Sequence, residues 1–232
     1  MPKRIAIVQS NYIPWRGYFD LMASVQEFVL YDDVQYTRRD WRNRNQIKTP
    51  QGLQWLTVPV RVKGKYLQAI RETEIEDGTP WSADHLKALS LNYRKAPFHD
   101  AVMEWLAPLY DAQPPLLSQL NRRLLAAIAG KLQIATRLTD SSEYALEGDK
   151  SERLASIAAQ AGAQVYVSGP AAKSYLDESV FRARGIDVEW FDYAGYQPYP
   201  QLWGEFIPNV TVLDLLFNCG DDARRHLKWA HP

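Results

Sequence analysis

The first 33 residues run through a short apolar segment, a turn, a helix and a second apolar segment, and this order constrains the fold most. Residues 3–9 are rich in Ile and Val and predict a buried strand. A turn containing Pro14 and Gly17 follows, then a helix over 17–26 and a strand over 27–32. Strand, turn, helix and strand in this order predict the start of a parallel α/β sheet.

The last third of the chain returns to the same alternation. Strands are predicted over 134–138, 164–167 and 186–191, with helical segments over 152–161 and 173–180 between them. Two closing helices are predicted over 211–218 and 221–229. We therefore predict one α/β domain over residues 1–232, with a doubly wound, Rossmann-like parallel sheet.

The middle of the chain differs from both ends. Strands are predicted over 55–60 and 69–77, the second from its alternating Ile70, Thr73 and Ile75. Thr79 and Pro80 then mark a helix start, and further helices are predicted over 98–110 and 116–130. We expect residues 79–132 to be a helical insertion or cap within the domain.

Composition excludes several classes of function. The chain has 232 residues, with 27 Lys and Arg against 27 Asp and Glu. Zero net charge argues against a nucleic-acid partner held by bulk electrostatics, and no apolar run is long enough for a membrane span. Cys219 is the one cysteine, expected to be a buried structural thiol, and the expected location is the cytoplasm. The high aromatic content, 12%, suggests a binding site or interface.

The candidate site lies where strands of the predicted sheet end, because open α/β sheets bind ligands beyond the carboxyl ends of their strands. Gly17 and Gly169 would let a ligand approach, and helices starting near Gly17 and Lys173 would offer backbone N–H groups to a phosphate. Asp32 and Asp33 suit Mg²⁺ or a ribose hydroxyl. The alternative is that these residues only form the turns at the strand ends, which contain Gly, Pro, Ser and Asp in any case. The predicted nucleotide- or substrate-binding residues are Gln9, Asn11, Tyr12, Pro14, Trp15, Gly17, Tyr18, Asp32, Asp33, Trp41, Arg42, Asn43, Ser168 and Gly169.

The segment 38–48 carries five basic residues and one acid and predicts an anion clamp. Guanidinium groups of Arg42 and Arg44 match phosphate oxygens, and Trp41 would stack on a base or sugar. The alternatives are a solvated basic loop and a strand edge protected by charge.

The predicted catalytic residues are His85, Arg44 and Lys173. His85 flanks the apolar face of its helix, where a neutral imidazole would act as general base. The alternative is a partly buried structural histidine. No two histidines have the spacing of metal ligands, so we predict no metal centre held by the protein.

These segments resemble the WbqC-like family of bacterial proteins over nearly the whole chain. The motifs that carry the resemblance are at residues 9–20, 28–35, 43–45, 55–60, 152–154, 166–169, 175–177 and 213–218. The resemblance implies a role in O-antigen and lipopolysaccharide biosynthesis, adding an aminoacyl, glycyl-type group to an amino sugar.

A second resemblance is to the nucleotidyltransferase and pantothenate-synthetase superfamily. Residues 15–18 stand where those proteins carry His-x-Gly-His, but neither histidine is present, and 168–174 is the candidate for their later loop. Arg16, Arg44, His85 or Lys173 would have to supply the missing positive charge.

The function predicted from the sequence is therefore a transferase or ligase that forms an amide on a nucleotide-linked amino sugar. A donor activated in place would require ATP and Mg²⁺, whereas a donor that arrives activated would require neither. The alternatives are a nucleotidyltransferase-like enzyme acting on a sugar phosphate and a non-catalytic module that binds a nucleotide sugar. In each case the partner is a small nucleotide or nucleotide sugar.

Overall fold

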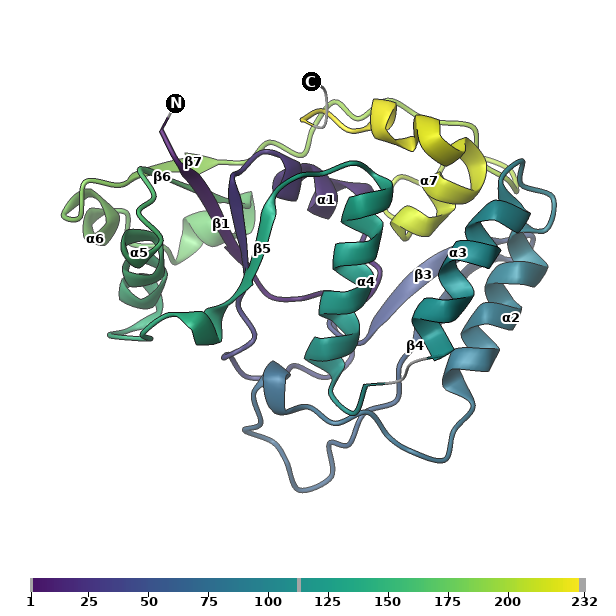
Figure 1. Cartoon of the computed structure of the whole chain (residues 1–232), viewed down its shortest axis with the longest axis horizontal. Coiled ribbons are helices and arrows are strands. Elements are labelled where there is room, and N and C mark those ends of the chain that lie inside the picture. The colour runs from purple at the N-terminus through teal and green to yellow at the C-terminus, as the bar shows by residue number, and fades with distance from the viewer. Residues whose placement is uncertain (1, 112–113, 230–232) are drawn as a thin grey trace.

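The computed structural model describes residues 2–111 and 114–229, and its centre is a five-stranded parallel sheet (Figure 1). The strands lie in the order β5-β2-β1-β6-β7. Their bounds are Arg4–Val8 (β1), Glu27–Leu30 (β2), Arg137–Asp140 (β5), Val165–Ser168 (β6) and Asp187–Trp190 (β7). The chain builds outward from β1 on one side and then on the other, which confirms the predicted Rossmann-like α/β fold.

Both faces of this sheet are covered, so its central strands β1, β2 and β6 are largely apolar and buried, whereas the edge strands β5 and β7 contain exposed polar residues. Ile5 and Ile7 of β1 face α5 (Lys150–Gln160) and α6 (Ser179–Arg182) in one cluster of buried residues. Ala6, between them, faces the opposite cluster, which includes α1 (Arg16–Ala23) and α4 (Leu117–Lys131). The alternation of strand side chains thus produces a hydrophobic core on each face.

Helices α2 (Trp81–Tyr93) and α3 (His99–Asp111) precede α4 in the second part of the segment between β4 and β5. Helices α2 and α3 lie on the right in Figure 1, near α7 (Val212–Cys219) and the antiparallel hairpin of β3 (Arg44–Thr49) and β4 (Gly52–Thr57). Tyr93 of α2 stacks on Phe217 of α7, with ring centroids 4.5 Å apart. No described helix is both long and apolar enough to cross a bilayer.

The strand predicted over 69–77 is not formed. Ile70–Glu72 is instead a short 3-10 helix, η1, although Ile70, Thr73 and Ile75 are buried as the alternation predicts. The backbone of this segment pairs with separate partners: Glu74 accepts from Arg61, and Ile75 donates to Pro115. A strand needs one continuous neighbour, and here each neighbour contributes a single bridge.

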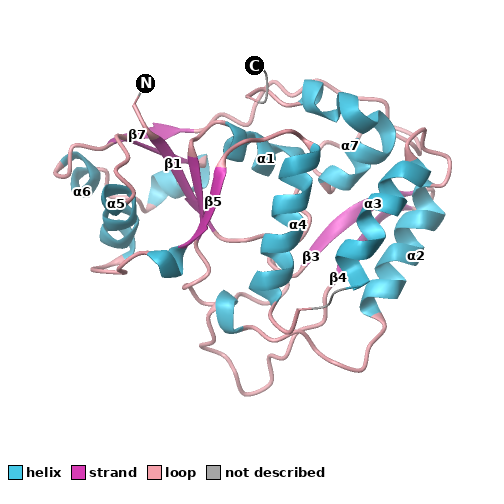
Figure 2. Cartoon of the chain, viewed as in Figure 1, coloured by secondary structure: helices cyan, strands magenta, loops and turns pink. Residues whose placement is uncertain are grey.

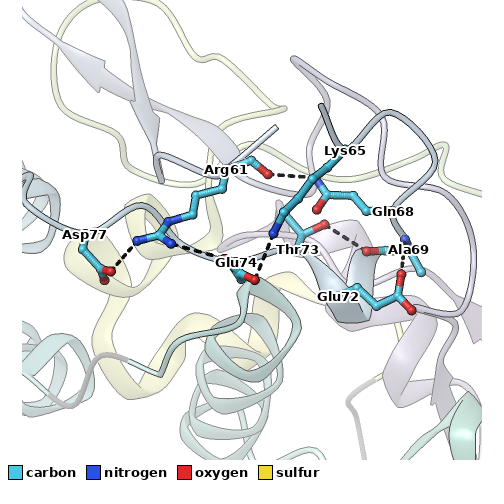
Figure 3. A network of polar contacts seen from close by, with 8 residues as sticks. All are labelled: Arg61, Lys65, Gln68, Ala69, Glu72, Thr73, Glu74 and Asp77. Atoms are coloured by element: carbon cyan, nitrogen blue, oxygen red, sulfur yellow. Dashed lines mark hydrogen bonds and ion pairs between the residues drawn. The ribbon is translucent and has the colours of Figure 1, made fainter. Parts of the chain in front are cut away.

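Side-chain contacts around η1 hold the adjoining loop (Figure 3). Arg61 pairs with Asp77 at 2.5 Å and with Glu74 at 3.5 Å, and Lys65 pairs with Glu74 at 2.9 Å. These groups are substantially exposed, so we assign them local ordering rather than large stabilisation.

Two helices predicted near the end of the chain differ from expectation. The segment 173–180 is divided between a 3-10 helix, Pro170–Ser174 (η3), and the four-residue α6. The segment 221–229 is replaced by a 3-10 helix, Gly220–His226 (η4). The basic segment predicted as a clamp also enters β3, whose residues pair in register with β4.

Residues 191–211, hereafter the strap, connect β7 to α7 without helix or strand (Figure 2). Such a long irregular segment in a domain is often functional. Two tyrosine hydroxyls anchor it by donating to buried aspartates: Tyr196 to Asp20 at 2.6 Å and Tyr199 to Asp214 at 2.8 Å. The guanidinium of buried Arg16 lies 4.8 Å from the ring of Tyr196, under the strap.

Glu27 links three parts of the sheet. Its carboxylate pairs with Lys3 at 2.8 Å and accepts hydrogen bonds from Thr139 at 3.1 Å and from the hydroxyl of Tyr144. Burial alone would raise the pKa of Glu27, but these hydrogen bonds outweigh burial and lower it. The stability from the ionised carboxylate is therefore present above the usual carboxyl pKa and is lost as pH falls through the lowered value.

We expect Glu27→Gln to lower the free energy of unfolding at pH 7 by about 1–3 kcal/mol, because a charge-assisted set of hydrogen bonds is lost. The difference from the wild type should shrink in acid, where the wild-type carboxyl is protonated. Urea unfolding at both pH values measures this. Glu189→Gln, which removes an exposed ion pair with Arg4, should cost under about 1 kcal/mol. Equal losses in the two variants would contradict this account.

Candidate functional site

The loop after β1 contains a strained residue. Ile13 has φ of 36°, in the left-handed region that β-branched residues rarely adopt. Such a conformation costs about 1–3 kcal/mol and persists only where neighbouring structure enforces it. Backbone strain of this kind concentrates at binding and catalytic sites, and here it lies just beyond the carboxyl end of a central parallel strand.

Hydrogen bonds from distant segments enforce this conformation. The side-chain amide of Asn45 in β3 donates to the carbonyl oxygens of Tyr12 at 3.1 Å and Ile13 at 3.0 Å. The hydroxyl of Thr211, at the start of α7, donates to the Ile13 carbonyl at 2.7 Å. The backbone N–H of Tyr12 donates to the Trp41 carbonyl at 3.0 Å. The loop is therefore fixed from β3, from the segment before it and from α7.

His85 of α2 contacts the same loop through the side chain of Tyr12. The Nδ1 atom of His85 lies 2.8 Å from the Tyr12 hydroxyl, which also contacts the hydroxyl of Tyr110, and the imidazole hydrogen-bonds the Thr57 backbone. Burial lowers the pKa of His85 to about 4, so the ring is neutral near pH 7. These contacts favour the structural alternative, and the general-base role stays a prediction.

A pocket of about 300 Å³, hereafter pocket 1, opens beside the strained loop. Its lining combines carboxamides, indoles and one proline: Asn11, Pro14, Trp15, Trp41, Asn45 and Asn209. None of these side chains is ionisable. Indole faces and amide groups suit an uncharged ring that carries hydroxyl or amide substituents, because the ring covers apolar surface while the amides exchange hydrogen bonds with its substituents.

Trp41 packs against a second tryptophan that does not line pocket 1. Its ring lies 5.4 Å from that of Trp55, and the Arg44 guanidinium lies 4.1 Å from the Trp55 ring on the other strand of the hairpin. The Arg44 side chain also donates to the Arg39 carbonyl. Arg44 thus contacts protein groups and lines neither of the pockets described here, so its predicted role toward phosphate stays a prediction.

Aromatic side chains lie beside Gly17 and Gly169, the two glycines at which the sequence predicts that a ligand approaches. A Cβ on Gly17 would lie 2.3 Å from the Trp15 indole, so this glycine makes room for Trp15 rather than open space for a ligand. Beyond β6, a Cβ on Gly169 would lie 3.5 Å from the Tyr193 hydroxyl. Trp15 and Tyr193 pack together with centroids 5.4 Å apart. The open space lies elsewhere along this edge of the sheet.

A second pocket, pocket 2, of about 230 Å³ lies beyond the carboxyl ends of β2 and β5. Its polar lining carries both signs of charge: Asp32, Asp33, Asp140, Arg71, Arg122, Ser118, Gln119, Ser141 and Ser142. Arg71 pairs with Asp33 at 2.8 Å and Arg122 with Asp140 at 2.8 Å. Within the described residues no group of three or more His, Cys, Asp or Glu is placed to hold a metal ion.

The predicted site residues are distributed over these features. Asn11, Pro14, Trp15 and Trp41 line pocket 1, and Asp32 and Asp33 line pocket 2. The others line neither pocket: Gln9, Tyr12, Gly17, Tyr18, Arg42, Asn43, Arg44, His85, Ser168, Gly169 and Lys173.

Arg42, Asn43 and Lys173, which line neither pocket, contact other groups of the protein. Arg42 donates to the Asn11 side chain and pairs with Asp40 at 3.2 Å. The buried amide of Asn43 donates to the Val58 carbonyl at 2.8 Å. Lys173 is exposed, with its ammonium 5.5 Å from the Trp190 ring.

Sequence reasoning missed Asn45 and Asn209 in pocket 1 and the two arginines of pocket 2. Asn45 follows Asn43 by two positions, and this alternation on a strand was a usable signal. Asn209 lies in the strap and Arg71 in the 3-10 helix η1, both far from β1 in the sequence, and no local pattern marks them.

We expect Gly17→Ala to displace the Trp15 indole, because the new methyl group would overlap the ring. Trp15 lines pocket 1, so the near-ultraviolet circular dichroism of tryptophan should change and any pocket 1 ligand should bind more weakly. Gly130→Ala is the matched control, since a Cβ there meets nothing within 4 Å. Unchanged tryptophan signals in Gly17→Ala would contradict the described packing.

We expect the lowered pKa of His85 to make stability fall with acid. The unfolded chain binds a proton near pH 6.5 and the folded chain only near 4, so stability is lost as pH falls between these values. His85 alone should contribute a loss of about 2 kcal/mol between pH 7 and pH 5.

Denaturant unfolding of His85→Gln at the two pH values checks this. The variant should lack that part of the pH dependence, whereas His99→Gln, at a histidine near the surface, should keep it. An identical slope in the wild type and His85→Gln would show that His85 is not held neutral by burial.

Comparison with known proteins agrees with the resemblance read from the motifs. The sequence model of the WbqC-like protein family matches residues 9–226. A protein of Mycobacterium tuberculosis strain ATCC 25618 / H37Rv, Rv1507c, described as uncharacterized, is 59% identical over 228 residues, which cover 98% of each chain. No solved structure matches, and the resemblance to nucleotidyltransferases stays a prediction. The chain belongs to the WbqC-like protein family.

Proposed function

We propose that this protein is a transferase or ligase that forms an aminoacyl-type amide on a nucleotide-linked amino sugar for a surface polysaccharide. Pocket 1 takes the sugar ring. The family resemblance suggests the reaction class, and the lining of pocket 1 is the observation that supports the choice of ligand.

The side chains that line pocket 1 suit a sugar ring. Trp15 and Trp41 present indoles to the pocket, while Asn11 and Asn209 offer both donors and acceptors. A sugar ring has apolar C–H faces and hydroxyl groups around its rim, which matches this combination. A phosphate group would find no cation in the lining.

The neutral lining also suits an attacking amine. An amine must be unprotonated to act as a nucleophile, and a pocket without carboxylates lowers the pKa of a bound ammonium by desolvation. The amine nitrogen then attacks the carbonyl carbon of the acyl donor, the C–N bond forms, and the leaving group departs with the bonding pair. The surplus amine proton passes to the leaving group or to water, so the mechanism does not require the buried His85.

Binding of a nucleotide-linked amino sugar should depend on Trp41. We expect Trp41→Ala to raise the dissociation constant about 2- to 10-fold, because an aromatic contact of roughly 0.5–1.5 kcal/mol is lost. Calorimetric titration with a panel of nucleotide-linked amino sugars measures the effect. Trp229→Ala, which removes another exposed indole, is the control and should leave affinity unchanged.

Product formation tests the reaction itself. The mass of the sugar product, with and without an amino acid and ATP, distinguishes amide formation from simple binding. Binding without any product across donors would identify the non-catalytic module, and pyrophosphate release from a sugar phosphate would identify the nucleotidyltransferase. Affinity that is the same in Trp41→Ala and the wild type would exclude pocket 1 as the sugar site.

A further inference from the structure

Pocket 2 is chemically unlike pocket 1. It offers acceptors from Asp32, Asp33 and Asp140 and donors from Arg71 and Arg122, with three serine hydroxyls among its lining residues. The side chain of Asp33 is only 7% exposed and already accepts from Arg71 and from the Ser141 hydroxyl at 2.6 Å. A ligand group that both donates and accepts hydrogen bonds suits this lining.

The charges that line pocket 2 restrict the class of ligand that it can bind. Its three carboxylates outnumber its two guanidinium groups, and both arginines are already paired with lining aspartates. A phosphate would meet repulsion from the carboxylates. Neighbouring hydroxyl groups can instead donate to a carboxylate and accept from an arginine or serine, and they carry no charge to be repelled. The lining therefore favours a vicinal diol.

The position of pocket 2 points to the same chemistry. Asp32 and Asp33 follow β2, the strand next to β1, after one intervening residue, Tyr31. In doubly wound sheets of this order, an acidic residue at the end of the second strand binds ribose hydroxyls of a nucleotide. The sheet here has the same order outward from β1, so pocket 2 lies on the side of β1 where a nucleoside would lie.

A continuous set of hydrogen bonds joins the two pockets. Asp32 accepts from the Ser10 backbone N–H at 2.9 Å, and the Ser10 hydroxyl accepts from Asn121 at 3.0 Å. Asn121 also donates to the Arg42 carbonyl at 2.9 Å, and Arg42 donates to the side chain of Asn11 in pocket 1. Pockets 1 and 2 therefore flank the Ser10–Asn11 segment.

We propose that pocket 2 binds the ribose of the same nucleotide-linked ligand whose sugar occupies pocket 1, with Asp33 and Asp140 accepting from its 2′- and 3′-hydroxyls. This assignment rests on the proposed function. It adds that the ligand is a ribonucleotide and that the two pockets form one extended site along the carboxyl edge of the sheet.

Calorimetric titration of the full chain with the four common ribonucleoside diphosphates and their 2′-deoxy counterparts tests this. At least one ribonucleotide should bind the wild type with a dissociation constant at least tenfold below that of its 2′-deoxy counterpart, because a hydroxyl donating to a carboxylate is lost. Asp33→Asn and Asp140→Asn should each weaken that ribonucleotide at least tenfold and reduce the discrimination. Glu189→Gln, on the opposite edge strand β7, should change neither value.

Asp140 is the safer of the two positions, since its side chain is 39% exposed and its replacement leaves the buried Asp33 pair intact. Equal affinity for each ribonucleotide and its 2′-deoxy counterpart, or discrimination that survives both variants, would overturn the ribose assignment, as would no binding of any nucleotide. If the assignment fails while Trp41→Ala still weakens binding of an amino sugar nucleotide, the proposed function stands. If there is neither ribose discrimination nor weaker binding in Trp41→Ala, both the ribose assignment and the proposed function are wrong.

Discussion

The side-chain amide of Asn45 bonds two successive carbonyl oxygens, those of Tyr12 and Ile13, and the candidate site depends on this contact. It joins the β3–β4 hairpin to the loop after β1 and helps to hold Ile13 at a φ of 36°. Asn11 and Trp15, on either side of strained Ile13, both line pocket 1. Thr211 adds a bond from the end of the strap, so segments far apart in the sequence fix one short loop.

Several titratable residues that the sequence offers as candidates for catalysis or ligand binding instead contact other residues of this protein. His85 contacts Tyr12 and Tyr110, Arg16 is buried beneath strap aromatics, and Lys48 donates to Gln201 at 2.8 Å. His85 thus hydrogen-bonds a buried tyrosine, Arg16 lies against aromatic rings, and Lys48 bonds a side chain of the strap. Pocket 1 is left without an ionisable side chain, so under the proposed function desolvation rather than a charged side chain would activate a bound amine.

The sheet was predictable from the sequence, whereas much of the site was not. Buried parallel strands are short apolar runs separated by helical periods, and these patterns are local, so β1, β2 and β6 could be identified. The 69–77 segment has the alternating buried residues of a strand, but its backbone pairs with separate neighbours that no local sequence pattern reveals. Asn11 and Asp32 could be placed at the carboxyl edge of the sheet because they follow strands, and each lines a pocket there. Gly17 was read as open space, although its absent side chain accommodates Trp15.

Under the proposed function, a sugar ring enters pocket 1 beside the strained loop. Side-chain amide signals of ¹⁵N-labelled asparagines, followed by NMR during titration with a nucleotide-linked amino sugar, test this directly. Signals of Asn11 and Asn209 should shift with the same saturation curve, while those of Asn92 and Asn218, bonded within α2 and α7, should stay in place. Saturable binding that leaves Asn11 and Asn209 unmoved would contradict the account.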